Sequence, residues 1–391
     1  MRKISADYIC PIAAEPIPEG VVVCDENGKI LEIGHRRGYD PAGVEIYRGA
    51  IVPGFVNTHC HLELSHMKGR VHTGTTLLPF LHSVVSMREI AMEEILDAIE
   101  RADREMYEGG IVAVGDISNK ADTAVCKEKS PLRYYTFVEM FDFLQDHLAD
   151  TTFERYYDVF QAQSSGNGNR KSCVPHAPYT VSPNLFRRIN QANERGVTVS
   201  IHNQETPHEN ELFRYKTGGF KTFLAQFGFS LDHFAPRGEN SIFYTLEHLR
   251  PDTRALFVHN TLTSREDIEA AQRWNPQVYW ATCPNANLYI ENRLPNYQVF
   301  MDTGAKVTIG TDSLTSNWQL SILEEMKTIL RYQSYVPFHT VLRWATLNGA
   351  EALGFEADLG SIETGKTPGL LLLDVGPDFR MDAATQVRRL I

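Results

Sequence analysis

Two histidines, His59 and His61, stand two residues apart at the end of the apolar run 51–61. The apolar run is bounded by the Pro53-Gly54 pair and has the residue types of a short buried strand. Alternate residues of a strand point to the same face, so both imidazoles can project toward one point. Two converging imidazole nitrogens supply half of a metal site. An isolated pair of histidines also occurs on exposed strand edges. A metal site is therefore indicated only if further ligands come from elsewhere in the chain.

Histidines and one aspartate also end later strand-like stretches. We expect these further strands over residues 111–116, 134–138, 172–176, 197–202, 255–259, 278–282 and 306–312. They alternate with helix-like stretches, as in a parallel α/β sheet, and together with 51–61 they number eight, as in a TIM barrel. His176, His202, His259 and Asp312 each fall at the carboxyl end of an expected strand. Because the βα loops at that end build the active site of a barrel, one shared site is predicted.

The segment 53–61, Pro-Gly-Phe-Val-Asn-Thr-His-Cys-His, resembles the first-strand signature of the amidohydrolase superfamily, specifically of its deaminase and chlorohydrolase branch. The resemblance extends over nearly the whole chain. It implies an α/β fold in which a metal-dependent (β/α)8 TIM barrel carries the site. In this family the chain ends build a small β-sandwich. We therefore expect segments 1–50 and 355–391 to form that domain and residues 51–354 to form the catalytic barrel.

The resemblance implies one divalent metal ion held by His59, His61, His202 and Asp312. Three imidazole nitrogens and one carboxylate suit zinc and leave a position for water, and iron is tolerated by the same set. Relatives with two metal ions need a bridging residue, usually a lysine, at the end of the fourth strand. Segment 174–180 has no lysine there. A single ion is therefore expected.

Two further residues resemble the proton-transfer groups of the family. Glu205 lies three residues after His202 and matches the His-x-x-Glu pattern, whose glutamate carries a proton to a ring nitrogen during deamination. His259 matches the sixth-strand histidine that orients the attacking hydroxide, and Asp312 is expected to act as a base as well as a ligand. The glutamate favours ammonia over chloride as the leaving group, because a protonated ring nitrogen makes the neighbouring carbon electrophilic.

The residues expected to contact a small-molecule substrate belong to less specific motifs. His176 and Tyr179 lie in a segment that resembles the fourth-strand motif of the family. Glu63 follows the His-x-His pair, and the alternatives for it are to cap a helix or to pair with Arg70 or Arg88. Trp318 lies near the last expected strand and can offer a face for stacking on a base. The seventh-strand motif departs from the family pattern, because Thr282 stands where a histidine is common. Any contact made by that histidine in relatives is therefore in doubt here.

The segment 61–65, His-Leu-Glu-Leu-Ser, followed by Gly69 and by segment 77–81, is similar to the 6-aminodeoxyfutalosine deaminases within the family. We therefore rank 6-aminodeoxyfutalosine and related adenosine derivatives first as substrates, guanine second and non-purine amines third. Two alternatives stay open. One is a hydrolase of the same fold that acts on a chlorinated or imino substrate, and the other is a non-catalytic barrel scaffold.

Composition excludes several classes of partner. The chain has 391 residues and a net charge of −11, which argues against nucleic acid or an anionic membrane as the main partner. Its six cysteines are scattered without a Cys-x-x-Cys pair, which suggests reduced thiols. No stretch approaches the ~18–20 apolar residues of a membrane span. A cytoplasmic location is expected, and the sequence leaves a homodimer open as the assembly.

Overall fold

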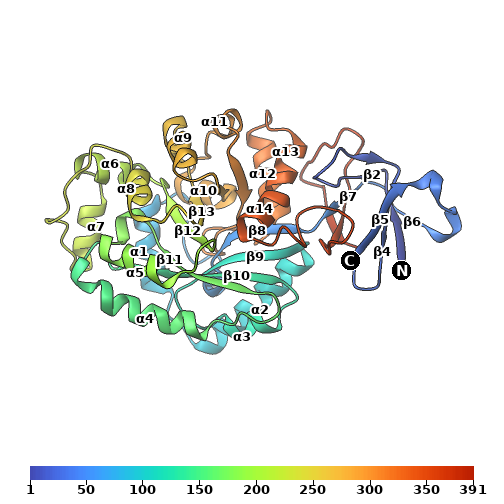
Figure 1. Cartoon of the computed structure of the whole chain (residues 1–391). Helices are drawn as coiled ribbons and strands as arrows, with labels where there is room; N and C mark the ends of the chain where they lie inside the picture. Colours follow the sequence, from blue (N-terminus) through green and yellow to red (C-terminus); the bar gives the residue numbers. More distant parts are fainter.

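The computed structural model describes residues 1–391, and its centre consists of two four-stranded parallel sheets (Figure 1). The strand order is β11-β10-β9-β8 in one sheet and β12-β13-β14-β15 in the other. The strands are β8 (Phe55–Cys60), β9 (Ile111–Ser118), β10 (Arg133–Met140), β11 (Arg170–Pro175), β12 (Thr198–Asn203), β13 (Arg254–His259), β14 (Val278–Thr282) and β15 (Lys306–Ile309). Neighbours pair in parallel because helical segments return the chain between successive strands.

The two sheets contact each other at both of their outer edges. Between β11 and β12, the backbone N–H of His202 donates to the carbonyl of His176 at 2.9 Å. At the other edge, the N–H groups of Thr311 and Asp312 each donate to the carbonyl of His59 at 3.0 Å. The carboxyl ends of β8, β11, β12 and β15 are therefore joined by backbone hydrogen bonds, which brings distant parts of the sequence to one place.

The expected run 51–61 is two strands. The strand β7 (Ala50–Pro53) pairs antiparallel with β16 (Leu370–Leu373), whereas β8 begins at Phe55 and pairs in the first parallel sheet. The break falls at Gly54, in the Pro-Gly pair that bounds the expected strand, and the chain passes there from one sheet into the other. The seven other expected ranges all overlap the observed strands.

Gly54 leaves no room for a side chain, and we expect Gly54→Ala to destabilise the fold. A Cβ at this position would meet Cγ1 of Val112 and would lie 2.7 Å from the carbonyl oxygen of Pro368. Overpacking of this kind lowers the free energy of unfolding by about 1–3 kcal/mol, which thermal unfolding would measure as a lower Tm. Gly38→Ala is the matched control, because a Cβ at Gly38 meets no atom within 4 Å. Equal Tm values for both variants would contradict this prediction.

Two further sheets lie beside each other on the right of Figure 1. The N-terminal segment supplies strands to both sheets, and the C-terminal segment supplies strands to one. Their strand orders are β5-β4-β1-β6 and β17-β16-β7-β2-β3. The additional strands are β1 (Arg2–Ser5), β2 (Tyr8–Ile9), β3 (Ile17–Pro18), β4 (Gly20–Cys24), β5 (Ile30–His35), β6 (Glu45–Ile46) and β17 (Val387–Arg389). The strands β4 and β5 form an antiparallel hairpin, with Gly28 in its turn at a φ of +81°. A small apolar cluster that includes Ile4, Val22, Ile51 and Leu370 packs in this region.

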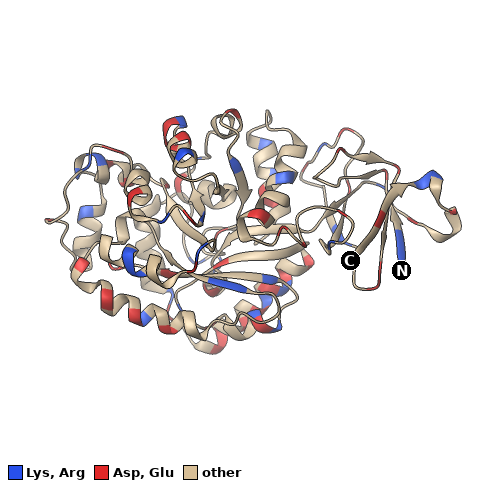
Figure 2. Ribbon diagram, viewed as in Figure 1, with Lys and Arg blue, Asp and Glu red and all other residues tan.

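Helices lie on the outside of the parallel sheets (Figure 1). They are α1 (Leu77–Met87), α2 (Met92–Glu108), α3 (Ala124–Lys129), α4 (Ala149–Ala162), α5 (Pro183–Ala192), α6 (Pro207–Tyr215), α7 (Phe220–Gln226), α8 (Ser241–His248), α9 (Arg265–Trp274), α10 (Pro284–Glu291), α11 (Tyr297–Asp302), α12 (Ile322–Tyr332), α13 (Phe338–Trp344) and α14 (Leu347–Leu353). Acidic and basic residues are interspersed along these outer helices, as Figure 2 shows for α2 and α4. None of the helices combines the length and the apolar composition that a membrane crossing requires.

Candidate active site

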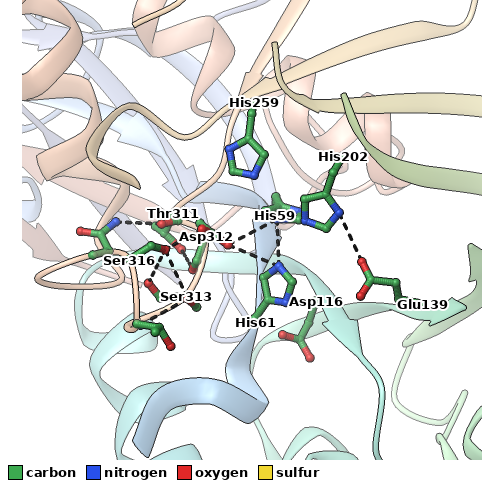
Figure 3. Close-up of polar contacts among 12 residues, drawn as sticks. His59, His61, Asp116, Glu139, His202, His259, Thr311, Asp312, Ser313 and Ser316 are labelled. Atoms are coloured by element: carbon green, nitrogen blue, oxygen red, sulfur yellow. Dashed lines mark hydrogen bonds and ion pairs between the residues drawn. The ribbon is translucent and has the colours of Figure 1, made fainter. Parts of the chain in front are cut away.

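Four side chains converge at the carboxyl ends of the strands: His59, His61, His202 and Asp312 (Figure 3). The Nε2 atoms of His59 and His61 lie 3.2 Å apart. Oδ1 of Asp312 lies 3.3 Å from Nε2 of His61 and 3.6 Å from Nε2 of His59. Ligand atoms of the three histidines all lie within 4.8 Å of one another. The structure therefore brings together the side chains that the sequence predicts as metal ligands.

The protonation states of this cluster suit a divalent metal ion. Burial lowers the pKa of His61 to about 3 and also lowers the pKa values of His59 and His202, so the imidazoles are neutral at pH 7. Burial opposes ionisation of Asp312, but its interactions with His59, His61 and His259 hold its pKa below its usual range. Neutral imidazoles and an ionised carboxylate are the forms that bind metal ions. The donor set therefore fits the ion that the sequence predicts.

Neighbouring groups orient two of these ligands. Nδ1 of His202 donates to the carbonyl of His176 at 2.8 Å, which leaves the lone pair of its Nε2 free for a metal ion. The hydroxyl of Ser316 donates to Oδ2 of Asp312 at 2.5 Å. Asp312 is thereby held with its other oxygen, Oδ1, facing the imidazoles of His59 and His61 (Figure 3).

Glu205 and His259 form a pair beside the cluster. Oε2 of Glu205 lies 3.7 Å from Nε2 of His259. Nδ1 of His259 donates to the amide oxygen of Asn287 at 2.9 Å, so Nε2 keeps its lone pair in the neutral ring. Burial raises the pKa of Glu205 to about 7. A carboxyl group in this range can both give and take a proton near neutral pH, which suits a general acid–base residue.

The loop that carries Glu205 is fixed by a second buried carboxylate, Glu209. Oε1 of Glu209 accepts a hydrogen bond from the backbone N–H of Gln204 at 2.9 Å, and Oε2 accepts one from that of Glu205 at 3.3 Å. Gln204 has a φ of +48°, a left-handed conformation that residues other than glycine seldom adopt. These two hydrogen bonds stabilise the turn at the end of β12 that places Glu205 at the cavity.

A cavity of about 370 Å³ opens at these residues. Its polar lining includes His61, His176, His202, Glu205, His259 and Asp312. Its apolar lining comes largely from α1, from α7 and the residue that follows it, and from the segment after β10, and includes Leu77, Phe80, Leu81, Val84, Phe141, Phe143, Phe223 and Phe227. An apolar cavity with a few converging polar groups is the usual form of a small-molecule site.

Two of the residues predicted to contact substrate line this cavity, namely His176 and Tyr179. Nδ1 of His176 lies 2.7 Å from the hydroxyl of Thr180, which fixes the imidazole ring. The ring of Tyr179 stacks on Phe220, with ring centroids 4.0 Å apart. Both side chains are therefore held in place by their neighbours and present fixed surfaces to the cavity.

The two other predicted contact residues, Glu63 and Trp318, are not part of the lining. Glu63 is buried behind it, where Oε1 pairs with Arg88 at 3.1 Å and Oε2 accepts from the backbone N–H of Asn119 at 2.9 Å. Trp318 is 50% exposed and packs against Tyr289. Glu63 can influence a ligand only through Arg88 and Asn119, both of which line the cavity.

Sequence reasoning missed several polar residues of the site, among them Glu139 and Asn287. Glu139 lies near the end of β10, lines the cavity and places Oε1 3.3 Å from Nδ1 of His202 (Figure 3). It directly follows the expected strand 134–138, so the positional argument used for the histidines also applies to it. Asn287 holds His259 from the start of α10. It lies five residues after Thr282, in the seventh-strand motif, but nothing in the sequence indicates this partner.

Comparison with known proteins agrees with this geometry. The family model described as amidohydrolase family matches residues 50–388, which is most of the chain. The chain belongs to the amidohydrolase family. The expected family and a hydrolytic activity on carbon–nitrogen bonds are thereby confirmed.

Three similar proteins illustrate the relationship. The adenosine deaminase of Helicobacter pylori is 26% identical over 390 residues, which cover 96% of this chain and 92% of the relative. The crystal structure of Helicobacter pylori aminofutalosine deaminase with methylthio-coformycin has a TM-score of 0.80 and 24% identity, and covers 97% of this chain and 94% of that one. An adenosine deaminase from Xanthomonas campestris with bound zinc has a TM-score of 0.74 and 25% identity, over 96% and 85% of the two chains. These matches show an α/β fold of the TIM-barrel type.

Proposed function

We propose that the chain is a metal-dependent deaminase that hydrolyses the aromatic amine of a purine nucleoside or a related purine compound and releases ammonia. The observation that carries the proposal is the shared cavity. His61, His202 and Asp312 of the ligand cluster line the same space as Glu205 and His259. The relatives named as adenosine and aminofutalosine deaminases support the same activity.

His59, His61, His202 and Asp312 would hold one divalent ion in this cavity. When bound, the ion would lower the pKa of a water molecule toward neutrality. The zinc bound in the Xanthomonas campestris relative supports zinc as the ion. Segment 174–180, at and after the end of β11, offers no lysine that could bridge to a second ion. We therefore propose a site for a single ion.

Two residues, Asp312 and His259, act on the attacking water. Oδ1 of Asp312 faces the centre of the cluster and accepts a proton from the water, while Ser316 holds the other oxygen of the carboxylate. Nε2 of His259 accepts a hydrogen bond from the water and orients it toward the substrate, because Nδ1 is committed to Asn287. Both groups are held by neighbours, so little reorganisation is needed when the reaction starts.

Glu205 completes the proton transfers. In its protonated form it gives a proton to the ring nitrogen next to the amine-bearing carbon, which makes that carbon electrophilic. The water oxygen then forms a bond with the carbon. The amine gains the proton that Asp312 took from the water, the carbon–nitrogen bond breaks and ammonia leaves. The new hydroxyl gives its proton to Glu205, which is thereby restored. Chloride leaves without a proton, whereas the amine leaves only after these transfers, so the buried Glu205 supports deamination over the alternative of a chlorinated substrate.

The cavity also bears on the substrate class. Its apolar walls suit a flat ring, and the net charge of −11 disfavours a highly phosphorylated compound. We rank 6-aminodeoxyfutalosine and related adenosine derivatives first and guanine second. A non-catalytic scaffold is not supported, because every predicted ligand and proton-transfer position carries a competent side chain.

We also propose that the eight parallel strands close into a (β/α)8 barrel and that the chain ends form a separate β-sandwich domain. The backbone hydrogen bonds from His202 to His176 and from Thr311 to His59 support closure at the two edges. The separate apolar cluster in the terminal sheets supports the second domain. We place the first boundary at Gly54 rather than after residue 50, because β7 pairs within a terminal sheet.

The test is to incubate the metal-replete chain separately with adenosine, 6-aminodeoxyfutalosine, guanine and a chlorinated triazine, and to follow release of ammonia and chloride. We expect ammonia from at least one adenosine-type compound and no chloride. Chloride release without deamination of any purine compound would contradict the proposed function and would leave only the family and the fold.

A further inference from the structure

Glu139 presents an unpartnered oxygen beside the cavity. Its side chain lies near the end of β10, is only 2% exposed and contributes to the cavity lining. Oε2 accepts a hydrogen bond from Nδ2 of Asn119 at 3.2 Å, but Oε1 has no hydrogen-bond partner. Nδ1 of His202 lies 3.3 Å from Oε1, yet its hydrogen is directed to the carbonyl of His176 (Figure 3). Buried polar atoms almost always have a hydrogen-bond partner, so we expect a ligand in the cavity to form a hydrogen bond with this oxygen.

A network of buried groups holds Glu139 in this position. Nδ2 of Asn119 donates both to Oε2 of Glu139 and to its carbonyl oxygen, at 3.2 and 3.1 Å. The backbone N–H of Asn119 in turn donates to Glu63, whose other oxygen pairs with Arg88. Glu63, which the sequence suggested as a contact residue, therefore holds Asn119 and Arg88 and does not itself line the cavity. The free oxygen of Glu139 is pre-organised, which is the usual state of a residue that recognises a ligand.

Glu139 has no role in the deamination steps proposed above. Asp312 and His259 act on the attacking water, and Glu205 acts on the ring nitrogen. Glu139 lies on the opposite side of His202 from the metal-ligating carboxylate Asp312, as Figure 3 shows. Its partner must therefore come from a part of the substrate other than the reacting amine and the ring nitrogen beside it.

A sugar hydroxyl has the chemistry that this position requires. A hydroxyl can donate to a carboxylate and can equally accept from a carboxylic acid, so the pairing does not depend on whether Glu139 is ionised. Of the compounds considered, a free base has no such group, whereas a nucleoside carries two hydroxyls on its ribose ring. We propose that Glu139 binds a ribose hydroxyl of the substrate and makes the enzyme selective for ribonucleosides over free bases and deoxynucleosides. This inference rests on the proposed deaminase function.

The first test uses the unaltered metal-replete enzyme. We expect kcat/KM for adenosine to exceed that for 2′-deoxyadenosine or for 3′-deoxyadenosine by about 3- to 100-fold, the range for losing a hydrogen bond to a neutral or a charged group. Adenine should be a poorer substrate than either. Equal kcat/KM for adenosine and both deoxynucleosides would overturn the assignment of Glu139 while leaving the deaminase function intact. No ammonia from any purine compound would overturn both.

The second test replaces the side chain. Glu139→Met keeps the volume and removes both oxygens, and Glu139→Gln keeps one oxygen and is expected to retain part of the selectivity. In Glu139→Met, kcat/KM for adenosine should fall to the value for the sensitive deoxynucleoside, which itself should change little. Equal losses on all substrates, or a loss of bound metal, would mean that Glu139 only positions His202 and would overturn the proposal. Glu105→Ala, at an exposed position on α2, is the control and should behave like the unaltered enzyme.

Discussion

Replacing His61 with alanine is expected to remove the bound metal ion and to abolish turnover. Nε2 of His61 lies 3.2 Å from the corresponding atom of His59 and 3.3 Å from Oδ1 of Asp312, so it is central to the ligand cluster. Without it, two imidazoles and one carboxylate remain, and such a set binds a divalent ion more weakly. Metal analysis of the purified variant and an ammonia assay would measure the two effects.

His147→Ala is the matched control for this experiment. His147 is exposed in the short helical turn before α4, and its side chain forms no hydrogen bond. This variant should keep one metal ion per chain and full activity. Full activity and retained metal in the His61→Ala variant would refute the assignment of the cluster.

Replacing Glu205 with glutamine is expected to lower kcat by at least ~100-fold, the lower range for loss of a general acid–base residue. Glutamine keeps the shape and the hydrogen bonding of Glu205 but cannot carry a proton. The metal ligands are unchanged, so the variant should still bind one ion. Steady-state kinetics with an adenosine-type substrate, together with metal analysis, would check both expectations.

The division of the effect between kcat and KM decides the role of Glu205. A change in KM alone would make Glu205 a binding residue and would weaken the argument for deamination. Glu239→Gln, in the exposed loop before α8, makes the same chemical change outside the site and should leave kcat unaltered.

The parallel strands and the ligand cluster could be predicted from the sequence because both have local signals. Apolar runs mark the strands, and the side chains predicted as metal ligands lie at the ends of those runs. The sheet that the residues before Gly54 join could not be predicted in the same way. Whether Ala50–Pro53 joins the barrel strands or a terminal sheet depends on pairing with Leu370–Leu373, which lies at the far end of the chain. Only the fold brings these segments together.

The substrate contacts were harder to predict because the direction of a side chain depends on its partners. Glu63 follows the His-x-His pair, yet Arg88 and the backbone of Asn119 occupy its carboxylate. Thr282, which stands where relatives often have histidine, shares a hydrogen bond with the hydroxyl of Tyr297 at 2.7 Å. Each of these partners is distant in sequence and carries no motif. Position at a strand end was therefore a better guide than motif similarity.

The most direct test of a single-metal deaminase is to titrate the metal-free chain with zinc. A chelator would first remove bound ions, and ammonia release from an adenosine-type substrate would be followed as zinc is added. The account predicts no activity without metal and a rise that stops at one zinc ion per chain. Ammonia release from the metal-free chain, or a rise that continues to two ions per chain, would contradict it.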